Sequence, residues 1–105
     1  MMDETGINYR WVLWFTELID SMPRGFSVTF NPSSVSANST SEQTFTVSGA
    51  NTNDVVVVNK PTHTAGLGIV NARVSAADTV AVTFMNTTGS AIDPPSETYT
   101  GYLVK

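Results

Sequence analysis

Hydrophobic and polar residues alternate along most of this chain with the two-residue period of β-strands. The clearest alternation is in residues 79–86, "TVAVTFMN", where Val80, Val82 and Phe84 share one face. The same reading predicts three further sets of inward-facing residues: Phe26, Val28 and Phe30; Phe45 and Val47; Val70, Ala72 and Val74. Between the segments lie clusters of turn-forming residues. The pattern therefore predicts a chain of short strands rather than helices.

The turns predict where the strands begin and end. Clusters at residues 51–54, 77–78 and 86–89 separate the segments, and Val35 with Ala37 predicts a brief edge strand inside a long polar connection. Pro94 and Pro95 lack the amide that strand pairing requires, so the closing strand "ETYTGYLVK" must begin after them. Six or seven strands with this spacing predict an antiparallel β-sandwich.

The first 24 residues follow a different pattern. Both tryptophans of the chain lie within residues 10–22, "RWVLWFTELIDSM", and the breaker "MPRG" ends this stretch. We predict an N-terminal aromatic docking segment at 1–24 and the β-sandwich domain at 25–105. Read as a helix, the segment gathers its large apolar residues on one stripe: Trp11, Trp14, Phe15, Leu18, Ile19 and Met22. The spacing favours a helix, but "RWVLWF" also suits an extended edge strand, so both conformations stay open.

Three roles are open for this segment. It could complete the core of its own sandwich, but the two inner faces of a sandwich already satisfy each other. It could lie in a membrane surface, but its polar face lacks the Lys and Arg that such helices use. An exposed stripe with two tryptophans is typical of a protein-binding surface, because Trp is enriched in interface hot spots. The preferred hypothesis is a protein interface formed by the six residues of the stripe.

Composition narrows the partners. The net charge is −4, and the five basic residues are scattered at Arg10, Arg24, Lys60, Arg73 and Lys105. No basic patch is therefore available for nucleic acid or anionic lipid. The longest uninterrupted apolar run, residues 11–15, is far shorter than the ~20 residues of a membrane span. We expect neither nucleic acid nor membrane as a partner.

Candidate chemistry is sparse. The single histidine, His63, has no cysteine anywhere in the chain to share a metal with and no recognisable catalytic spacing around it. "GLG" at 66–68 lacks the third glycine of a dinucleotide fingerprint, and the acidic residues stand in turns rather than in a calcium loop. We expect no catalytic residue, no metal and no cofactor, and hence no enzyme.

The stretch "NDVVVVNKPTHTAGLGIVNARVSAADTVAVTFMNTTGSAIDPPSETY", residues 53–99, resembles a small immunoglobulin-like module of virion proteins of tailed bacteriophages. The upstream "NPSSVSANSTSEQTFTVSG" fits the same module, whereas the N-terminal segment lies outside it. Asn53 stands where similar sequences often carry a glycine, a departure compatible with the same turn. The resemblance implies an immunoglobulin-like sandwich and a structural, non-enzymatic role.

What the resemblance implies about function is a capsid decoration (cement) protein, or an accessory piece of a neck, tail or fibre. The partners would be other virion proteins, either the major capsid protein or neck and tail proteins. Such proteins commonly form trimers or other symmetric oligomers, so a homo-oligomer is expected, located in the virion and assembled in the host cytoplasm. A receptor- or glycan-binding fibre domain is the alternative, with Tyr99 or Tyr102 and the loop at 61–66 as its contact residues.

Overall fold

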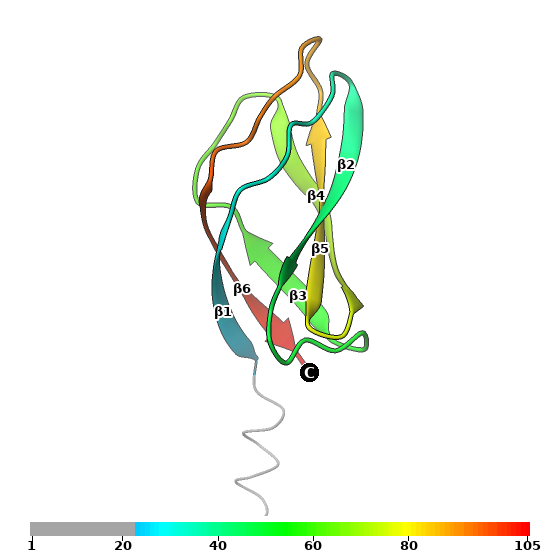
Figure 1. Cartoon of the computed structure of the whole chain (residues 1–105), viewed down its shortest axis with the longest axis vertical. Helices are drawn as coiled ribbons and strands as arrows, with labels where there is room; N and C mark the ends of the chain where they lie inside the picture. The colour runs from blue at the N-terminus through cyan, green and yellow to red at the C-terminus, as the bar shows by residue number, and fades with distance from the viewer. Residues whose placement is uncertain (1–22) are drawn as a thin grey trace, which may run out of the picture.

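The computed structural model describes residues 23–105, which form two three-stranded antiparallel sheets (Figure 1). One sheet has the order β1–β6–β3 and the other the order β2–β5–β4. The strands are β1 (Arg24–Phe30), β2 (Ser39–Thr46), β3 (Val55–Asn59), β4 (Leu67–Ala76), β5 (Thr79–Asn86) and β6 (Glu97–Val104). The predicted all-β antiparallel architecture is confirmed. The six residues of the predicted interface stripe lie outside the described residues, as does the choice between helix and extended chain.

The core forms where the inner faces of the two sheets meet. Val80, Val82 and Phe84 of β5 are fully buried, as their alternation predicts, and Tyr99 and Leu103 of β6 are buried with them. Burial of each such side chain contributes roughly 1.5–3 kcal/mol. The middle strands β5 and β6 therefore contribute much of the stability of the core.

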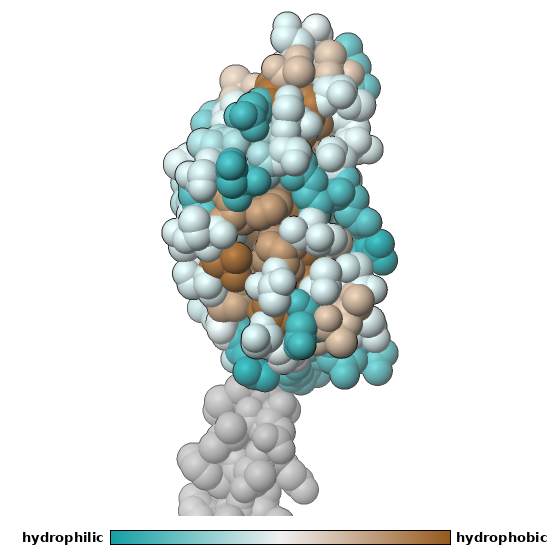
Figure 2. Space-filling view, viewed as in Figure 1, coloured by the Kyte–Doolittle hydropathy of each residue, from teal (hydrophilic) through white to brown (hydrophobic). Residues whose placement is uncertain are grey.

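Aromatic rings fill one side of this core. The ring of Phe30 on β1 packs at 5.2 Å from that of Phe45 on β2 and at 5.6 Å from that of Tyr99, which ties the two sheets together. Some apolar surface stays accessible. Figure 2 shows brown surface in the middle of the face that it presents, and Phe26 and Val28 of β1 are only partly buried.

Two sequence predictions need correction, one of an inward-facing residue and one of a strand. Val70 is predicted to point inward but is 56% exposed, because the register with β5 shifts between Ile69 and Asn71. A β-bulge there reverses the alternation, so Ile69 takes the inward place while Ala72 and Val74 keep theirs. The predicted brief strand at 35–37 is also wrong, since Val35 makes only a single antiparallel bridge, to Ile92.

Val35 is nevertheless completely buried, and a side chain fixes the loops around it. Asn86, at the end of β5, donates its amide to the carbonyl oxygens of Val35 (3.0 Å) and Ser90 (2.8 Å) and accepts a bond from the backbone of Thr88. A buried amide with all these partners holds two loops in place, because leaving any of them unpaired would cost free energy.

The connections give the domain two distinct ends (Figure 1). The connections 47–54 and 77–78 lie at the end where β1 begins and β6 finishes, with Asp78 in the left-handed conformation at φ 58°. We call this the proximal end. The connections 31–38, 60–66 and 87–96 lie at the distal end, and Pro94 and Pro95 precede β6 as predicted. The segment 1–22 therefore joins the domain at the proximal end.

Candidate protein-binding face

The outer face of the β1–β6–β3 sheet is the most apolar exposed surface of the described residues. Alternation directs Val55 and Val57 of β3 and Tyr102 of β6 to solvent, where they are 62%, 55% and 56% exposed. Val104, beside Val55 in the register, adds to them. The rest of this face is Gly25, Ser27, Thr29, Asn59, Thr98 and Thr100. We call these ten residues the uncharged face, because none carries a charge.

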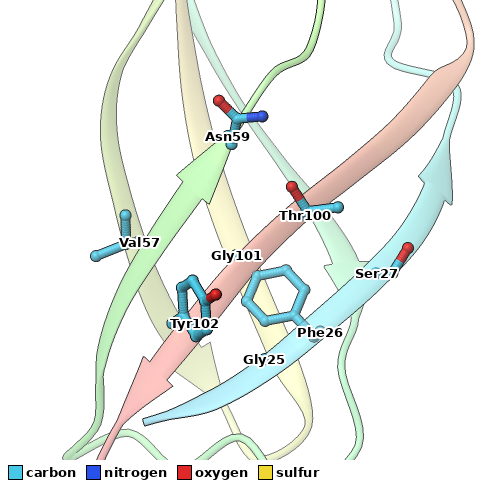
Figure 3. Close-up of a pocket in the computed structure, with 8 residues that line it drawn as sticks. All are labelled: Gly25, Phe26, Ser27, Val57, Asn59, Thr100, Gly101 and Tyr102. Carbon is cyan, nitrogen blue, oxygen red and sulfur yellow. The ribbon is translucent and has the colours of Figure 1, made fainter.

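An open groove of about 520 Å³ crosses this sheet, lined by residues of all three strands (Figure 3). Tyr102 on β6 and Val57 on β3 are register partners, and Figure 3 shows the ring of Phe26 beside the β6 ribbon at Gly101. Gly101 is required there, since a β-carbon would collide with the Val57 carbonyl oxygen and lie 2.6 Å from Phe26. The missing side chain lets the strands approach each other closely beneath the groove.

The outer face of the β2–β5–β4 sheet has a different character. Glu42 on β2 and Arg73 on β4 reach toward each other across β5 and form a two-bonded ion pair, with both N–O distances at 2.9 Å. Ala81 of β5, which pairs with Arg73 in the register, is 1% exposed although it points outward. The hydrogen bond from Arg73 holds the pKa of Glu42 below its usual value. The ion pair and the threonine side chains make this face more polar than the other one, although Val70 and Met85 of the same sheet are also exposed.

A polar network closes the distal end of the β1–β6–β3 sheet. Lys60 lies 3.1 Å from a carboxylate oxygen of Glu97, and both side chains are 10% exposed. The Thr62 hydroxyl donates to the same carboxylate at 2.6 Å, while the Lys60 ammonium also donates to the Thr62 carbonyl at 2.9 Å. The Thr62 bond, with Lys60 second, lowers the pKa of Glu97. The network fastens the β3–β4 connection to β6.

A second network closes the proximal end. Lys105 donates to a carboxylate oxygen of Asp54 at 2.7 Å and to the Gly49 carbonyl at 2.8 Å. The bond from Lys105, with one from the backbone of Asn51, holds the pKa of Asp54 below its usual value. The C-terminal strand is therefore anchored beside the connection that precedes β3.

The two tyrosines of the alternative hypothesis, Tyr99 and Tyr102, differ in solvent exposure. Tyr99 is predicted as an exposed contact residue, but it is fully buried on the inner face of β6, so that prediction is wrong. Burial, with the charge of Glu97 second, raises the pKa of its hydroxyl to about 12, and this hydroxyl lacks a hydrogen-bond partner among the described residues. Tyr102 is exposed as predicted, although on a strand rather than a loop.

Sequence reasoning missed the uncharged face, although a signal for it was present. In "ETYTGYLV" the residues Glu97, Tyr99, Gly101 and Leu103 alternate with Thr98, Thr100, Tyr102 and Val104. Bulk alone does not tell which set points inward, because each contains one tyrosine and one aliphatic residue. The partners Phe26 and Val28, paired with Gly101 and Tyr99, decide the matter.

Within residues 23–105 no group of three or more His, Cys, Asp or Glu side chains is placed to hold a metal ion, and His63 stands exposed in the β3–β4 connection. In the same part of the chain there is no helix of the length and apolarity needed to cross a membrane. Comparison of the chain with models of protein families, with curated proteins and with solved structures finds no match. The uncharged face is thus the surface on which a functional conclusion can be built.

Proposed function

We propose that this protein is a non-enzymatic structural component of a phage particle, a capsid decoration protein that docks through its N-terminal aromatic segment. The observation that supports a binding role is the contrast between the two outer faces. One carries the Glu42–Arg73 ion pair, whereas the other is uncharged and exposes Val55, Val57 and Tyr102. Surfaces of this kind are typical of protein interfaces. The assignment to a virion rests on the resemblance of residues 53–99.

The strand order supports an immunoglobulin-like topology. In that fold, strands B, E and D form part of one sheet and strands C, F and G form the other. The order β2–β5–β4 corresponds to B–E–D, and β3 beside β6 corresponds to C–F. The N-terminal strand β1 then takes the place of G, antiparallel to β6 as G is to F. The domain on this reading is an immunoglobulin-like sandwich whose first strand replaces its last.

In the proposed mechanism, burial of the N-terminal segment supplies the free energy of binding. Full burial of a large apolar side chain contributes roughly 1.5–3 kcal/mol, so Trp11, Trp14, Phe15 and Leu18 together suffice for tight attachment without ion pairs. The segment joins β1 at the proximal end, next to Leu103 of β6 in the register. A partner that binds the segment would therefore meet the proximal end of the sandwich and leave the distal loops facing outward.

The test is deletion of residues 1–22, which leaves the whole of β1 in place. We expect the truncated protein to keep its β-sheet circular dichroism and its cooperative unfolding, but to fail to bind particles that lack the protein. Exchange of Trp11 and Trp14 for serine in the full chain should weaken binding in the same direction. If the truncated protein instead unfolds, the segment belongs to the core of the domain and the docking mechanism is wrong.

The location in the particle has its own measurement, the number of copies per virion. A decoration protein covers a capsid lattice, so we expect hundreds of copies, whereas neck and tail rings hold on the order of six to eighteen by their symmetry. A count in the lower range would contradict the capsid assignment and move the protein to the neck or tail.

The alternative function is receptor or glycan binding by a tail or fibre protein, and one observation favours it. The groove combines the exposed ring of Tyr102 with the polar groups of Ser27, Asn59 and Thr100, a pairing of apolar surface with a few polar groups that is typical of ligand sites. On that alternative, Tyr102→Ala would abolish adsorption to host cells while assembly stays normal. Normal adsorption by the variant would leave capsid decoration as the better account.

A further inference from the structure

Of the four sheet edges among the described residues, only that of β3 lacks the features that prevent strands from pairing with other chains. The edge strand β2 carries Glu42, and β4 carries Arg73 and two register shifts. The edge strand β1 carries a charge at its first residue, Arg24. Charges, prolines and bulges of this kind protect exposed edges. In contrast, β3, "VVVVN", has no charge, no proline and no shift against β6.

The backbone of β3 has hydrogen-bonding groups directed to this edge. The Val57 carbonyl points toward β6, because a β-carbon on Gly101 would collide with it. Backbone polar groups alternate sides along a strand. Val56 and Val58 therefore direct their N–H and C=O groups away from β6, to a side where no described strand pairs with them. Unpaired groups at a β-forming edge are a template for an added strand.

We infer that the strand added at this edge is β3 of a second copy, running antiparallel about a twofold axis at Val57. Val56 of each copy then exchanges two hydrogen bonds with Val58 of the other. The resulting sheet has six strands in the order β1–β6–β3–β3–β6–β1. The twofold axis makes the contact closed, so it stops at two copies.

The twofold axis favours antiparallel over parallel pairing at this edge. An axis perpendicular to the sheet lets Val56 of each copy exchange hydrogen bonds with Val58 of the other, and it keeps the outer faces of both sheets on one side. The charges that flank β3 do not oppose this pairing, because Asp54 is paired with Lys105 and Lys60 with Glu97 within each copy.

The pairing also joins the two uncharged faces into one surface. Val57 of one copy becomes the neighbour of Val57 of the other, and Val55 of each copy faces Asn59 of the other, with Tyr102 and Val104 of each copy next in line. A five-residue strand supplies few hydrogen bonds against the entropy cost of association, so the contact is weak in dilute solution. Copies held close together on a surface would associate far more strongly through their high effective concentration. The inference itself concerns the purified protein and does not depend on capsid attachment.

Single cysteines test both the contact and its register, because the chain has no cysteine of its own. The twofold axis brings the two Val57 α-carbons to about 4.5 Å, inside the range of a disulfide. In the full-length protein we expect Val57→Cys to form disulfide-linked dimers at least about tenfold faster than Val55→Cys under mild oxidation. The two Val55 positions lie four residues out of register, roughly 13 Å apart along the strands. Thr44→Cys, exposed on the edge strand β2 of the other sheet, is the matched control and should react as slowly as Val55→Cys.

Equal rates for Val57→Cys and Thr44→Cys would overturn the inference, since cross-linking would then follow random collision. A faster reaction of Val55→Cys than of Val57→Cys would overturn the register. Sedimentation gives a second measurement without cysteine. Val57→Lys places two ammonium groups opposite each other and should weaken self-association at least tenfold, whereas Thr44→Lys, on the other sheet, should leave it unchanged. Unchanged self-association in Val57→Lys would contradict the β3–β3 contact.

Discussion

The substitution Gly101→Ala adds one methyl group at the tightest place in the β1–β6–β3 sheet. The new β-carbon would collide with the Val57 carbonyl oxygen and stand 2.6 and 2.9 Å from two atoms of the Phe26 ring. Ordinary contact begins at about 3.4 Å, so the ring must retreat by roughly 0.8 Å, and the carbonyl cannot retreat without disturbing the pairing of β3 with β6.

The expected loss in free energy of unfolding is the difference between two opposing effects. Overpacking costs about 1–3 kcal/mol, and the rigid carbonyl places this site at the upper end. Replacing glycine by alanine in a strand recovers about 0.5–1 kcal/mol of backbone entropy. The net loss in free energy of unfolding is therefore about 2 kcal/mol, or roughly 8–16 °C in Tm for a domain of this size.

The assay is urea unfolding followed by far-ultraviolet circular dichroism, with Gly68→Ala as the matched control. Gly68 also lies in a strand, but a β-carbon there would have no neighbour within 4 Å. The control should be unchanged or more stable by about 0.5–1 kcal/mol. If Gly101→Ala and Gly68→Ala unfold at the same urea concentration, the close approach of β6 to β3 is not as described.

Three further substitutions test other parts of the structure. Tyr99→Phe should raise the free energy of unfolding by about 1 kcal/mol because it removes a buried hydroxyl without a partner among the described residues. The pKa of the Tyr99 hydroxyl is raised from 10.0 to about 12, so the wild-type protein loses stability as the pH rises from 10 toward 12. The variant should lack this loss in alkaline unfolding curves. The lowered pKa of Glu97 contributes stability above its ordinary value of 4.5 that is lost as the pH falls, so Glu97→Gln should be less stable at pH 7 and lose less between pH 7 and pH 3. Gly66→Ala should lower the free energy of unfolding, because Gly66 has φ 81° and a β-carbon would collide with the Thr88 methyl group. A second change, Thr88→Ser, should restore part of this loss. Full additivity of the two changes would exclude the contact.

The parts of the fold that sequence reasoning predicted are those governed by neighbours along the chain. Val80, Val82 and Phe84 alternate without interruption, and all three are buried. Pro94 and Pro95 mark the beginning of β6 because the lack of an amide acts locally. Alternation and proline chemistry need no knowledge of what lies across the sheet.

The parts that escaped prediction depend on residues far apart in sequence. The bulge that turns Val70 outward arises from its pairing with β5, and its segment has the same alternation as a regular strand. The bonds from Lys60 and Thr62 to Glu97 join the β3–β4 connection to β6, and no spacing rule relates these positions. Tyr99 and Tyr102 have similar local sequence, so only the partner strands decide that one is buried and the other exposed.

The position of β1 beside β6 has a consequence for how the protein can be modified. Because Arg24 is the register partner of Leu103, the first and last strands meet the solvent at the same end of the sandwich. On the proposed docking mechanism, a purification tag added after Lys105 would emerge next to the point where residues 1–22 join and would hinder attachment. The connection at 87–90 lies at the opposite end, where a β-carbon added at Gly89 would have no neighbour within 4 Å. A small label on a cysteine introduced at position 89 would lie far from the point where residues 1–22 join and, unlike an inserted peptide, would leave the hydrogen bonds of Asn86 to Thr88 and Ser90 in place.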